Sequence, residues 1–419
     1  MSLTYISLVV IIFFELFQRG NTDCDVASVT TASGTQAPEG KICPGDLIFE
    51  DTFDKVDLSK WQYEISLWGG GSVESKSLIW PDGDLTYRLP IILEYLRRPN
   101  TYVLLKERGC FQGGNYEFQW YNNDRNNSYT EDGIYHIRPT LLADDTGEDF
   151  LYSGTIDLGN TCTNSENYGC RREGTTENVL NPIKSSRIHS IDTFSFKYGK
   201  VEARAKVPAG DWLWPAFWMM PRYSVYSGWP ASGEIDIMES RGNKQLIGSS
   251  GVNIGAQQVG STMHWGPNYN VNKFLLTHWE QNNDAGYDVD FHNYQLEWTP
   301  EKIEFSVDDV IIGSVSPPEG GFWELGSLSD TGLENPWINS TNIRMAPFDQ
   351  EFFLIINLAV GGTGYFPDDA TNPGGKPWLN TSPHAATDFW KGEDQWLPTW
   401  NRETDSSHLQ VDYVRVWAL

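Results

Sequence analysis

Short segments with alternating apolar residues are the feature that most constrains the fold of this chain. Residues 200–207, Lys-Val-Glu-Ala-Arg-Ala-Lys-Val, place an apolar side chain at every second position. Because successive side chains of a β-strand point to opposite faces, this spacing predicts a strand with one buried face. Similar runs at 294–298, 302–307, 352–358 and 409–417 are separated by Gly, Pro, Asn and Asp. Long helical patterns are scarce, so we expect an all-β sandwich of two antiparallel sheets.

The charge of the chain limits its partners. It carries 56 acidic and 30 basic residues, a net charge of −26, which repels phosphate backbones and predicts no nucleic-acid partner. A neutral polymer such as a polysaccharide is indifferent to this field, and simple solubility explains the charge equally well. The 18 Trp residues cluster near Pro, Gly and Asn. Flat rings in such places suit the apolar faces of sugars, although many of them will belong to the core.

The N-terminal 20 residues are interpreted as a signal peptide. Their apolar run is too short for a membrane span, which takes about 20 residues, and it has the length of a signal-peptide core. The alternative is a buried helix, because no Lys or Arg precedes the run and no small-residue cleavage site follows it. We therefore expect a secreted, extracellular protein without a membrane partner.

The cysteines and sequons agree with secretion. Cys24 with Cys43, and Cys162 with Cys170, would close short polar loops as disulfides, while Cys110 is left over. Residues 21–44 would form a cysteine-containing N-terminal arm. No Cys/His spacing typical of a metal site occurs, so no metal ligands are assigned. Three sequons are glycosylation candidates or chance occurrences: Asn126, Asn339 and Asn380.

Residues 233–239, Gly-Glu-Ile-Asp-Ile-Met-Glu, carry the chemistry. In a regular strand Glu234 and Asp236 share one face, and Glu239 falls on the opposite face with the isoleucines. That would bury a carboxylate in the core, which is unfavourable. A β-bulge near Met238 would add one residue and return Glu239 to the face of the other two acids.

Three carboxyl groups on one strand face suit glycoside hydrolysis. Like charges in close contact force at least one group to keep its proton, which separates the pKa values of the acid and the nucleophile. Retaining glycosidases place two carboxyl groups about 5–5.5 Å apart for this purpose. A solvated acidic strand or a calcium site is the alternative, but aromatic residues flank these acids on both sides.

Segment 233–239 resembles the bulged active-site strand of glycoside hydrolase family 16, in its laminarinase branch. Segments 47–53, 115–121, 196–206 and 214–221 resemble further strands of that family, and the resemblance covers about 47–68 and 115–417. It implies a concanavalin A-like β-jelly roll with a concave substrate cleft. The catalytic domain would span 45–419.

The family resemblance also implies roles for individual residues. Glu234 would be the nucleophile, Glu239 the general acid/base, and Asp236 would tune their protonation. Trp218 could instead be core, His264 could be structural, and Arg204 could form a salt bridge with Glu202 or Asp236. The residues expected to bind sugar are Trp214, Trp218, Trp229, His264, Trp265, Arg204 and Asn115.

An insert at about 72–114 departs from the family pattern. It is basic, locally helix-like and contains Cys110, and such a long insertion between two strands is unusual. It is either a functional loop or sequence that the mature protein lacks, such as a retained intron. The insert leaves the position of Asn115 open.

The resemblance supports endo-hydrolysis of β-1,3-glucan with retention, without a required cofactor. The alternative is a non-catalytic β-1,3-glucan recognition protein of innate immunity, since the family includes such animal proteins and many have lost the acids. A related specificity, such as mixed-linkage glucan or transglycosylation, is a third interpretation. A structural Ca²⁺ near Glu50 and Asp412 is considered beside their interpretation as surface acids. We expect a monomer that lacks the additional N-terminal carbohydrate module of its relatives.

Overall fold

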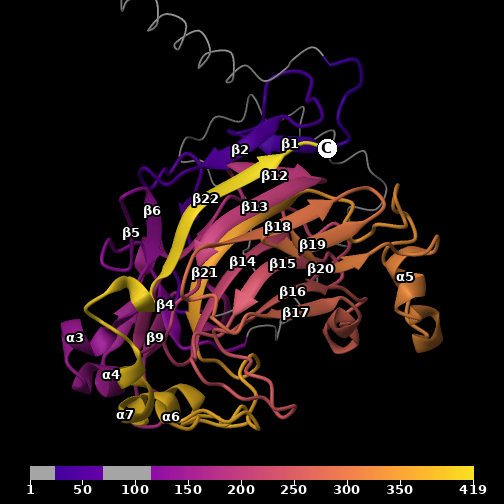
Figure 1. The fold of residues 1–419 in the computed structure, drawn as a ribbon. Helices are drawn as coiled ribbons and strands as arrows, with labels where there is room; N and C mark the ends of the chain where they lie inside the picture. The colour runs from indigo at the N-terminus through magenta and orange to yellow at the C-terminus, as the bar shows by residue number, and fades with distance from the viewer. Residues whose placement is uncertain (1–23, 69–114) are drawn as a thin grey trace, which may run out of the picture.

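The computed structural model describes residues 24–68 and 115–419 (Figure 1). The predicted signal peptide at 1–20, the insert at 72–114 and Cys110 lie outside the described residues. Two large antiparallel sheets are stacked as a sandwich, which confirms the predicted β-jelly roll.

The nine-stranded sheet contains the strand with the three acids. Its strand order is β1-β12-β21-β14-β15-β16-β17, with β11 paired to β21 and β3 paired to β11. The strands are β1 Thr31–Gly34, β3 Gln62–Tyr63, β11 Arg187–His189, β12 Phe194–Lys197, β14 Leu213–Pro221, β15 Glu234–Ser240, β16 Gln258–His264, β17 His278–Asn282 and β21 Phe352–Val360.

The eight-stranded sheet covers the other side of the core. Its order is β20-β19-β18-β13-β22-β6-β5, with β2 paired to β22. The strands are β2 Leu47–Asp51, β5 Ser128–Glu131, β6 Ile134–Ile137, β13 Gly199–Lys206, β18 His292–Trp298, β19 Ile303–Val307, β20 Val310–Val315 and β22 Leu409–Trp417. Each of the five runs predicted from alternation lies in a strand of these two sheets, apart from the end residues Val207 and Lys302, which lie just outside β13 and β19.

Two small sheets and short helices complete the described part. One small sheet joins β4 (Gln119–Tyr121), β10 (Ile183–Ser185) and β7 (Thr140–Leu141), and another joins β8 (Thr155–Asp157) and β9 (Arg171–Glu173). The α-helices are α3 Leu142–Thr146, α4 Asp149–Ser153, α5 Gly321–Leu325, α6 Ala385–Lys391 and α7 Glu393–Trp396. The 3₁₀ helices are η2 Gly159–Thr161, η3 Glu166–Tyr168, η4 Tyr269–Val271, η5 Phe274–Leu276, η6 Leu328–Thr331, η7 Leu397–Thr399 and η8 Asp405–Ser407.

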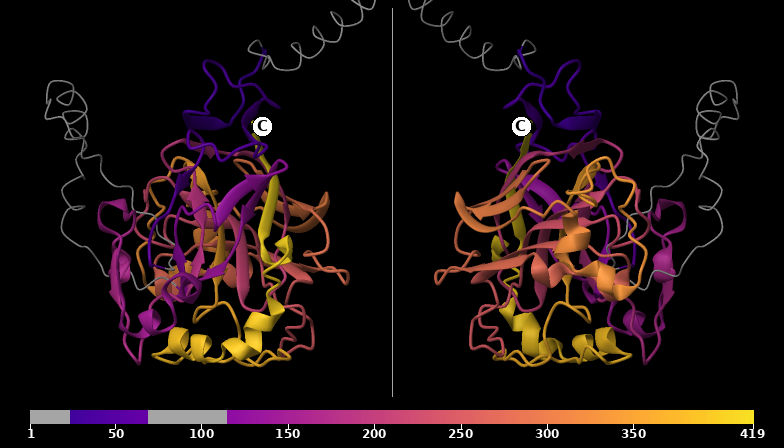
Figure 2. Two further views of the ribbon diagram at one scale, coloured as in Figure 1. Left: turned by 90° about the vertical axis from the view of Figure 1, so that its left-hand side faces the viewer. Right: turned by 90° about the vertical axis from the view of Figure 1, so that its right-hand side faces the viewer.

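The ends of the sandwich differ. The described N-terminal segment and the C-terminus lie together at one end, and α6 and α7 lie at the opposite end (Figure 2). A hydrogen bond from Ser28 Oγ to the carbonyl oxygen of Leu419, 2.5 Å long, ties the N-terminal arm to the last residue. The arm is therefore an integral part of this end of the fold.

Alternation along the strands builds the core between the sheets. Val201, Ala203 and Ala205 of β13 pack into the same buried cluster as Ile235 and Ile237 of β15. A second, smaller buried cluster lies on the other face of the nine-stranded sheet. Its members are Ile191, Ala216, Trp218, Met220, Phe353 and Ile355. This face of the sheet is the one on which the acids lie.

Both predicted disulfides are present. Cys24 bonds to Cys43 and Cys162 to Cys170. In the described residues no helix has the length and apolar character needed to cross a membrane. Of the sequon residues, Asn126 and Asn339 are exposed and Asn380 is half-buried.

Candidate active site

A β-bulge in β15 interrupts the alternation of this strand, as predicted from parity. Trp218 of β14 pairs with Asp236, but the neighbouring Phe217 pairs with Met238. Ile237 therefore has no partner in that ladder. The register with β16 on the other side shifts in the same interval, between Asp236 and Glu239. The bulge thus adds one residue to β15 relative to both neighbouring strands.

The extra residue sorts acids and apolar residues onto opposite faces. Ile235, Ile237 and Met238 all pack in the core between the sheets. Glu239, in contrast, remains partly exposed. The result is that Glu234 and Glu239 lie on the same face with Asp236 between them.

Each glutamate is held by an indole. Trp229 Nε1 donates a hydrogen bond to Glu234 Oε2. Trp214 Nε1 donates to Glu239 Oε1 over 2.9 Å. A donor aimed at a carboxylate fixes its orientation and is stronger than a bond between neutral groups. The aromatic residues that flank the acids in sequence therefore position the acids in the fold.

The central acid is buried and faces a histidine. Asp236 is 3 % exposed, and His264 Nε2 lies 3.3 Å from its Oδ2. His264 Nδ1 is 2.8 Å from Asn272 Nδ2. The Asn272 amide nitrogen can only donate, so His264 Nδ1 accepts this hydrogen bond. The proton of the neutral ring is then on Nε2, the nitrogen that faces Asp236. His264 thus contacts the central acid, and its sugar-binding role stays a prediction.

Burial keeps protons in this group of acids. Burial and the neighbouring Asp236 carboxyl raise the pKa of Glu234 to about 8, although His264 and the Trp229 bond oppose this shift. Burial, followed by the charge of Glu239, raises the pKa of Asp236 well above its ordinary range. The three groups therefore do not all ionise at neutral pH. The strand can present a carboxylate and a protonated carboxyl group together.

Trp214 is the first of three stacked side chains. Its ring lies parallel to Tyr365, with centroids 4.0 Å apart, and the guanidinium of Arg241 lies 4.0 Å from the Tyr365 centroid. Tyr365 covers one face of Trp214, which limits this ring as a sugar platform and fixes its N–H. Neither Tyr365 nor Arg241 was predicted from the sequence. The available signal was an aromatic residue after the turn at 361–364, Gly-Gly-Thr-Gly.

Comparison with known proteins decides the family. The model for glycosyl hydrolases family 16 matches residues 159–321. A β-1,3-glucan-binding protein of Penaeus monodon is 42 % identical over 385 residues, which are 89 % of this chain and 90 % of that protein. The chain belongs to glycosyl hydrolases family 16.

Two further similarities extend across the chain. β-1,3-Glucan-binding protein 1 of Galleria mellonella is 33 % identical over 395 residues, 91 % of this chain, which spans 65 % of that protein's length. A solved structure from a study of endo-acting O-glycanases of the human gut microbiota matches with a TM-score of 0.52 and 19 % identity. That match covers 91 % of this chain and 92 % of the other, and it shows a shared fold.

Two of the other predicted sugar platforms of this family 16 chain differ in exposure. Trp218 is 5 % exposed, belongs to the smaller buried cluster and donates to Asn357 Oδ1 over 2.7 Å. The core alternative therefore describes Trp218 better. Trp229 is half-buried and tilted against His264 and Tyr269, with centroids 5.5 and 5.6 Å away. Tyr269, which was not predicted from the sequence, is exposed and places a second aromatic ring beside Trp229.

Two predicted sugar contacts of the family 16 site are wrong. Trp265 is fully buried, packs against Phe322 and donates to Thr277 Oγ1 over 2.8 Å. It neighbours His264 in sequence, so strand alternation turns its side chain to the core. Arg204 lies in β13 between core residues and points outward from the eight-stranded sheet, where it forms an ion pair with Asp412. That pair differs from the two alternatives considered for Arg204.

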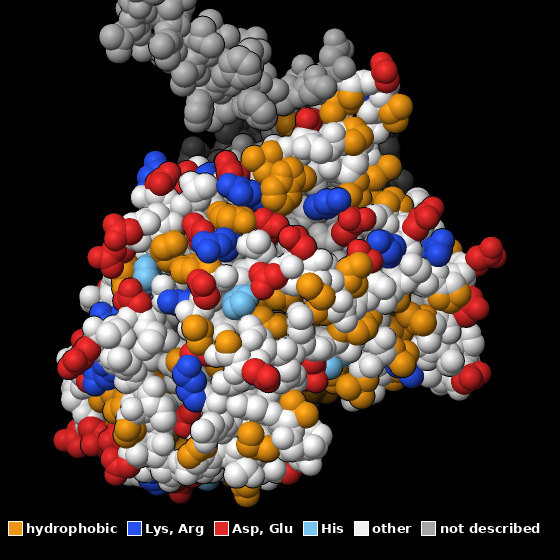
Figure 3. Space-filling view, in the orientation of Figure 1, with side chains coloured by type: hydrophobic (Ala, Val, Ile, Leu, Met, Phe, Trp, Pro, Cys, Tyr) orange, Lys and Arg blue, Asp and Glu red, His pale blue; other side chains and the backbone are white. Residues whose placement is uncertain are grey.

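The calcium candidates lie in ion pairs. Arg415 Nε is 2.8 Å from Glu50 Oε1, and Arg204 holds Asp412. Acidic and basic side chains are interspersed over the face visible in the space-filling view (Figure 3). A calcium ion at Glu50 or Asp412 would have to displace the guanidinium group that is paired with it. Calcium binding stays a prediction.

A buried ionic group lies beside the smaller cluster. Arg187 forms a 3.0 Å ion pair with Glu64, and its guanidinium is 5.4 Å from the Trp218 ring. Burial raises the pKa of nearby Glu117 to about 7. The predicted Asn115 is exposed, and its carbonyl oxygen accepts from Thr363 N over 2.5 Å. These contacts join residues far apart in sequence, so no local pattern could predict the group.

Proposed function

We propose that this chain hydrolyses β-1,3-glucan internally and with retention, using Glu234 as nucleophile and Glu239 as acid/base. The bulged register of β15 carries the proposal, because it puts both glutamates on one face of the same strand. The names of the Penaeus and Galleria relatives support β-1,3-glucan as the polymer. Two disulfides support export into an oxidising compartment.

The proposed reaction has two steps. Glu239, oriented by Trp214, donates its proton to the glycosidic oxygen while Glu234 attacks the anomeric carbon and the leaving chain departs. A glycosyl ester on Glu234 results. Glu239, now a carboxylate, removes a proton from water, which attacks the anomeric carbon and breaks the bond between this carbon and the Glu234 oxygen, so that Glu234 is released as a carboxylate. Asp236 retains a proton because burial raises its pKa well above the ordinary range. Glu234 attacks in its ionised form, whose share of the molecules grows as the pH approaches its pKa of about 8.

A specific experiment assigns the two glutamates. With an activated aryl β-glycoside of a β-1,3-linked glucan oligosaccharide, Glu234→Gly leaves room for azide to attack opposite the leaving aryl oxide, which yields the α-glycosyl azide. Glu239→Gly still forms the glycosyl ester, and azide then yields the β-azide. Product anomers are read by NMR. The same azide anomer from both variants, or wild-type activity on laminarin in Glu234→Gly, contradicts the assignment.

A matched control separates loss of chemistry from loss of fold. Glu304 lies in β19 of the other sheet and pairs with Lys302, 3.1 Å away. Glu304→Gln should release reducing ends from laminarin at the wild-type rate.

The second candidate is glucan recognition without hydrolysis. It is favoured by the relatives above, which are named as binding proteins. Retention of wild-type protein on insoluble β-1,3-glucan, with no soluble product after prolonged incubation, would support it over hydrolysis. Binding with steady product release would support the enzyme.

A further inference from the structure

Two histidines lie side by side on the outer face of the eight-stranded sheet. In the ladder between β6 and β22, His136 is opposite Gln410. His408 stands two residues before Gln410, so it lies diagonally across from His136 on the same face. Tyr135 and Ile137 fill the core, which directs His136 away from it.

Both imidazoles are buried although they face outward. His136 is 3 % exposed and His408 4 % exposed. Tyr129 of β5 stacks on His136, with centroids 4.9 Å apart and planes 3° from parallel. The two imidazole rings are 5.7 Å apart and nearly perpendicular. The neighbouring 3₁₀ helix η8 supplies Asp405, whose side chain is about half exposed.

The facing atoms form a donor set. Asp405 Oδ1 is 3.3 Å from His408 Nδ1, and Oδ2 is 3.9 Å from His136 Nδ1. Neither Nδ1 atom makes a hydrogen bond in the described structure. Buried polar atoms are nearly always satisfied, so two such nitrogens beside one carboxylate indicate a missing partner.

Electrostatics favour the state that binds a metal ion. Burial lowers the pKa of His136 and lowers that of His408 to about 4, so both rings are neutral at physiological pH and offer lone pairs. Asp405 and Glu131 favour a cation here, while Arg138 and Lys206 oppose it.

We propose that His136, His408 and Asp405 form a binding site for a divalent transition-metal ion such as Zn²⁺. Two imidazoles and one carboxylate are ligands that zinc prefers, whereas calcium prefers oxygen. The three donor atoms lie within 4.8 Å of one another. Zinc bonds of about 2.0–2.2 Å in a tetrahedron require donors about 3.3 Å apart. Binding therefore requires the donor atoms, which now lie within 4.8 Å of one another, to move closer together.

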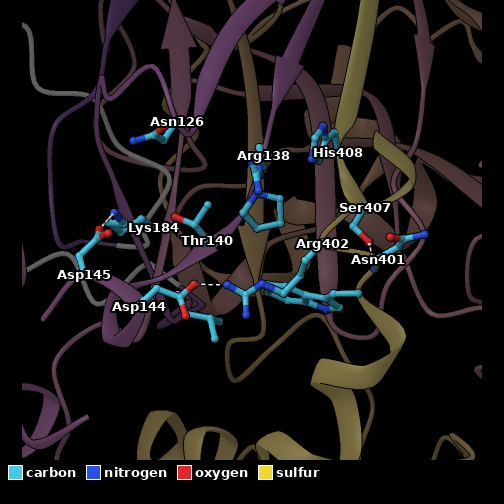
Figure 4. Close-up of a pocket in the computed structure, with 13 residues that line it drawn as sticks. Asn126, Arg138, Thr140, Asp144, Asp145, Lys184, Asn401, Arg402, Ser407 and His408 are labelled. Atoms are coloured by element: carbon cyan, nitrogen blue, oxygen red, sulfur yellow. Dashed lines mark hydrogen bonds and ion pairs between the residues drawn. The ribbon is translucent and has the colours of Figure 1, made fainter. Parts of the chain in front are cut away.

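The bound ion would join β6 to the segment that enters β22. His408 also lines a pocket of about 250 Å³ with Arg138 and Arg402, which is separate from the acid strand (Figure 4). Water completes the coordination of the ion. The site is a structural clamp, independent of the proposed hydrolysis.

Zinc uptake by the tag-free full chain tests the proposal. Equilibrium dialysis with Zn²⁺ should give one ion per wild-type chain at micromolar concentration, and zinc should raise its Tm. His408→Gln and Asp405→Asn should each weaken binding at least tenfold and abolish the Tm rise. Asp405 is half exposed, so its variant is expected to fold, and circular dichroism verifies this.

A matched control addresses the other group that could hold a metal among the described residues, which is Glu234, Asp236 and His264. His264→Gln should leave zinc uptake unchanged. Failure of the wild type to bind zinc, or wild-type affinity in both His408→Gln and Asp405→Asn, overturns the proposal. The proposal is also overturned if His264→Gln is the only variant that loses zinc uptake. If His408→Gln does not fold, the Cu²⁺ electron paramagnetic resonance spectrum of the wild type must show two nitrogen ligands, and their absence overturns the site.

Discussion

Trp214 donates its indole N–H to Glu239 across the ladder that joins β14 to the acid strand. Ala216, two residues further along β14, is the residue that pairs with Glu239, so Trp214 approaches the carboxyl group along the same face. Tyr365 is stacked on the Trp214 ring. Trp214 is thus a positioning residue for the proposed acid/base, as well as a wall of the site.

Replacing Trp214 with Phe tests this positioning. Phe keeps an aromatic ring against Tyr365 but lacks the N–H. Since a hydrogen bond to a charged group is worth about 1.5–3 kcal/mol, kcat on laminarin should fall about 10- to 100-fold with little change in KM. A rise in KM at unchanged kcat would mean that Trp214 acts as a sugar platform instead.

The raised pKa of Glu234 predicts a pH-dependent stability. The unfolded carboxyl group ionises near its ordinary pKa of 4.5, whereas the folded one keeps its proton up to about pH 8. The stabilising effect of this proton is complete below pH 4.5 and is lost as the pH rises to 8. Glu234→Gln does not titrate, so its Tm should exceed that of the wild type by an amount that grows from pH 5 to 8. Calorimetry at several pH values measures this, with Glu304→Gln expected to follow the wild type. A constant Tm difference would contradict the raised pKa.

Trp229 and Arg204 should differ sharply in their effect on activity. Trp229 bonds Glu234, and its ring is partly exposed beside it. Arg204 points outward from the other sheet. Initial rates on laminarin should therefore give a kcat/KM at least about tenfold lower for Trp229→Ala, from the lost bond alone. Arg204→Ala should have the kcat/KM of the wild type. A tenfold lower kcat/KM in Arg204→Ala would contradict this and would mean that sugar binds on the eight-stranded sheet.

The three sequons should differ in glycan occupancy. Asn380 Nδ2 donates to the carbonyl oxygen of Phe366 over 2.9 Å, and its Oδ1 accepts from Lys376 Nζ over 2.7 Å. A glycan on this nitrogen would compete with both bonds. Asn126 and Asn339 are exposed. Peptide mapping of protein secreted from insect cells should find glycans at Asn126 and Asn339 and an unmodified Asn380. Full occupancy at Asn380 would contradict this ordering.

Local patterns in the sequence were sufficient for the fold class and the acid strand. Alternation predicted strands such as β13 and β22, because one buried face requires an apolar residue at every second position. The same parity predicted the bulge, since Glu239 would otherwise enter the core. Loop length predicted the two disulfides.

Contacts between distant segments were decided by the tertiary structure. Trp265 and Arg204 carry suitable side chains for sugar, but whether they meet it depends on which sheet and which face holds them. Tyr365 reaches Trp214 because β21 is the neighbour of β14, and sheet order is not a local property. The sequence by itself determined that three acids share one strand face, because side-chain parity depends on adjacent residues. Only the tertiary structure decided which indoles and which histidine contact them, because packing brings together residues that the chain keeps far apart.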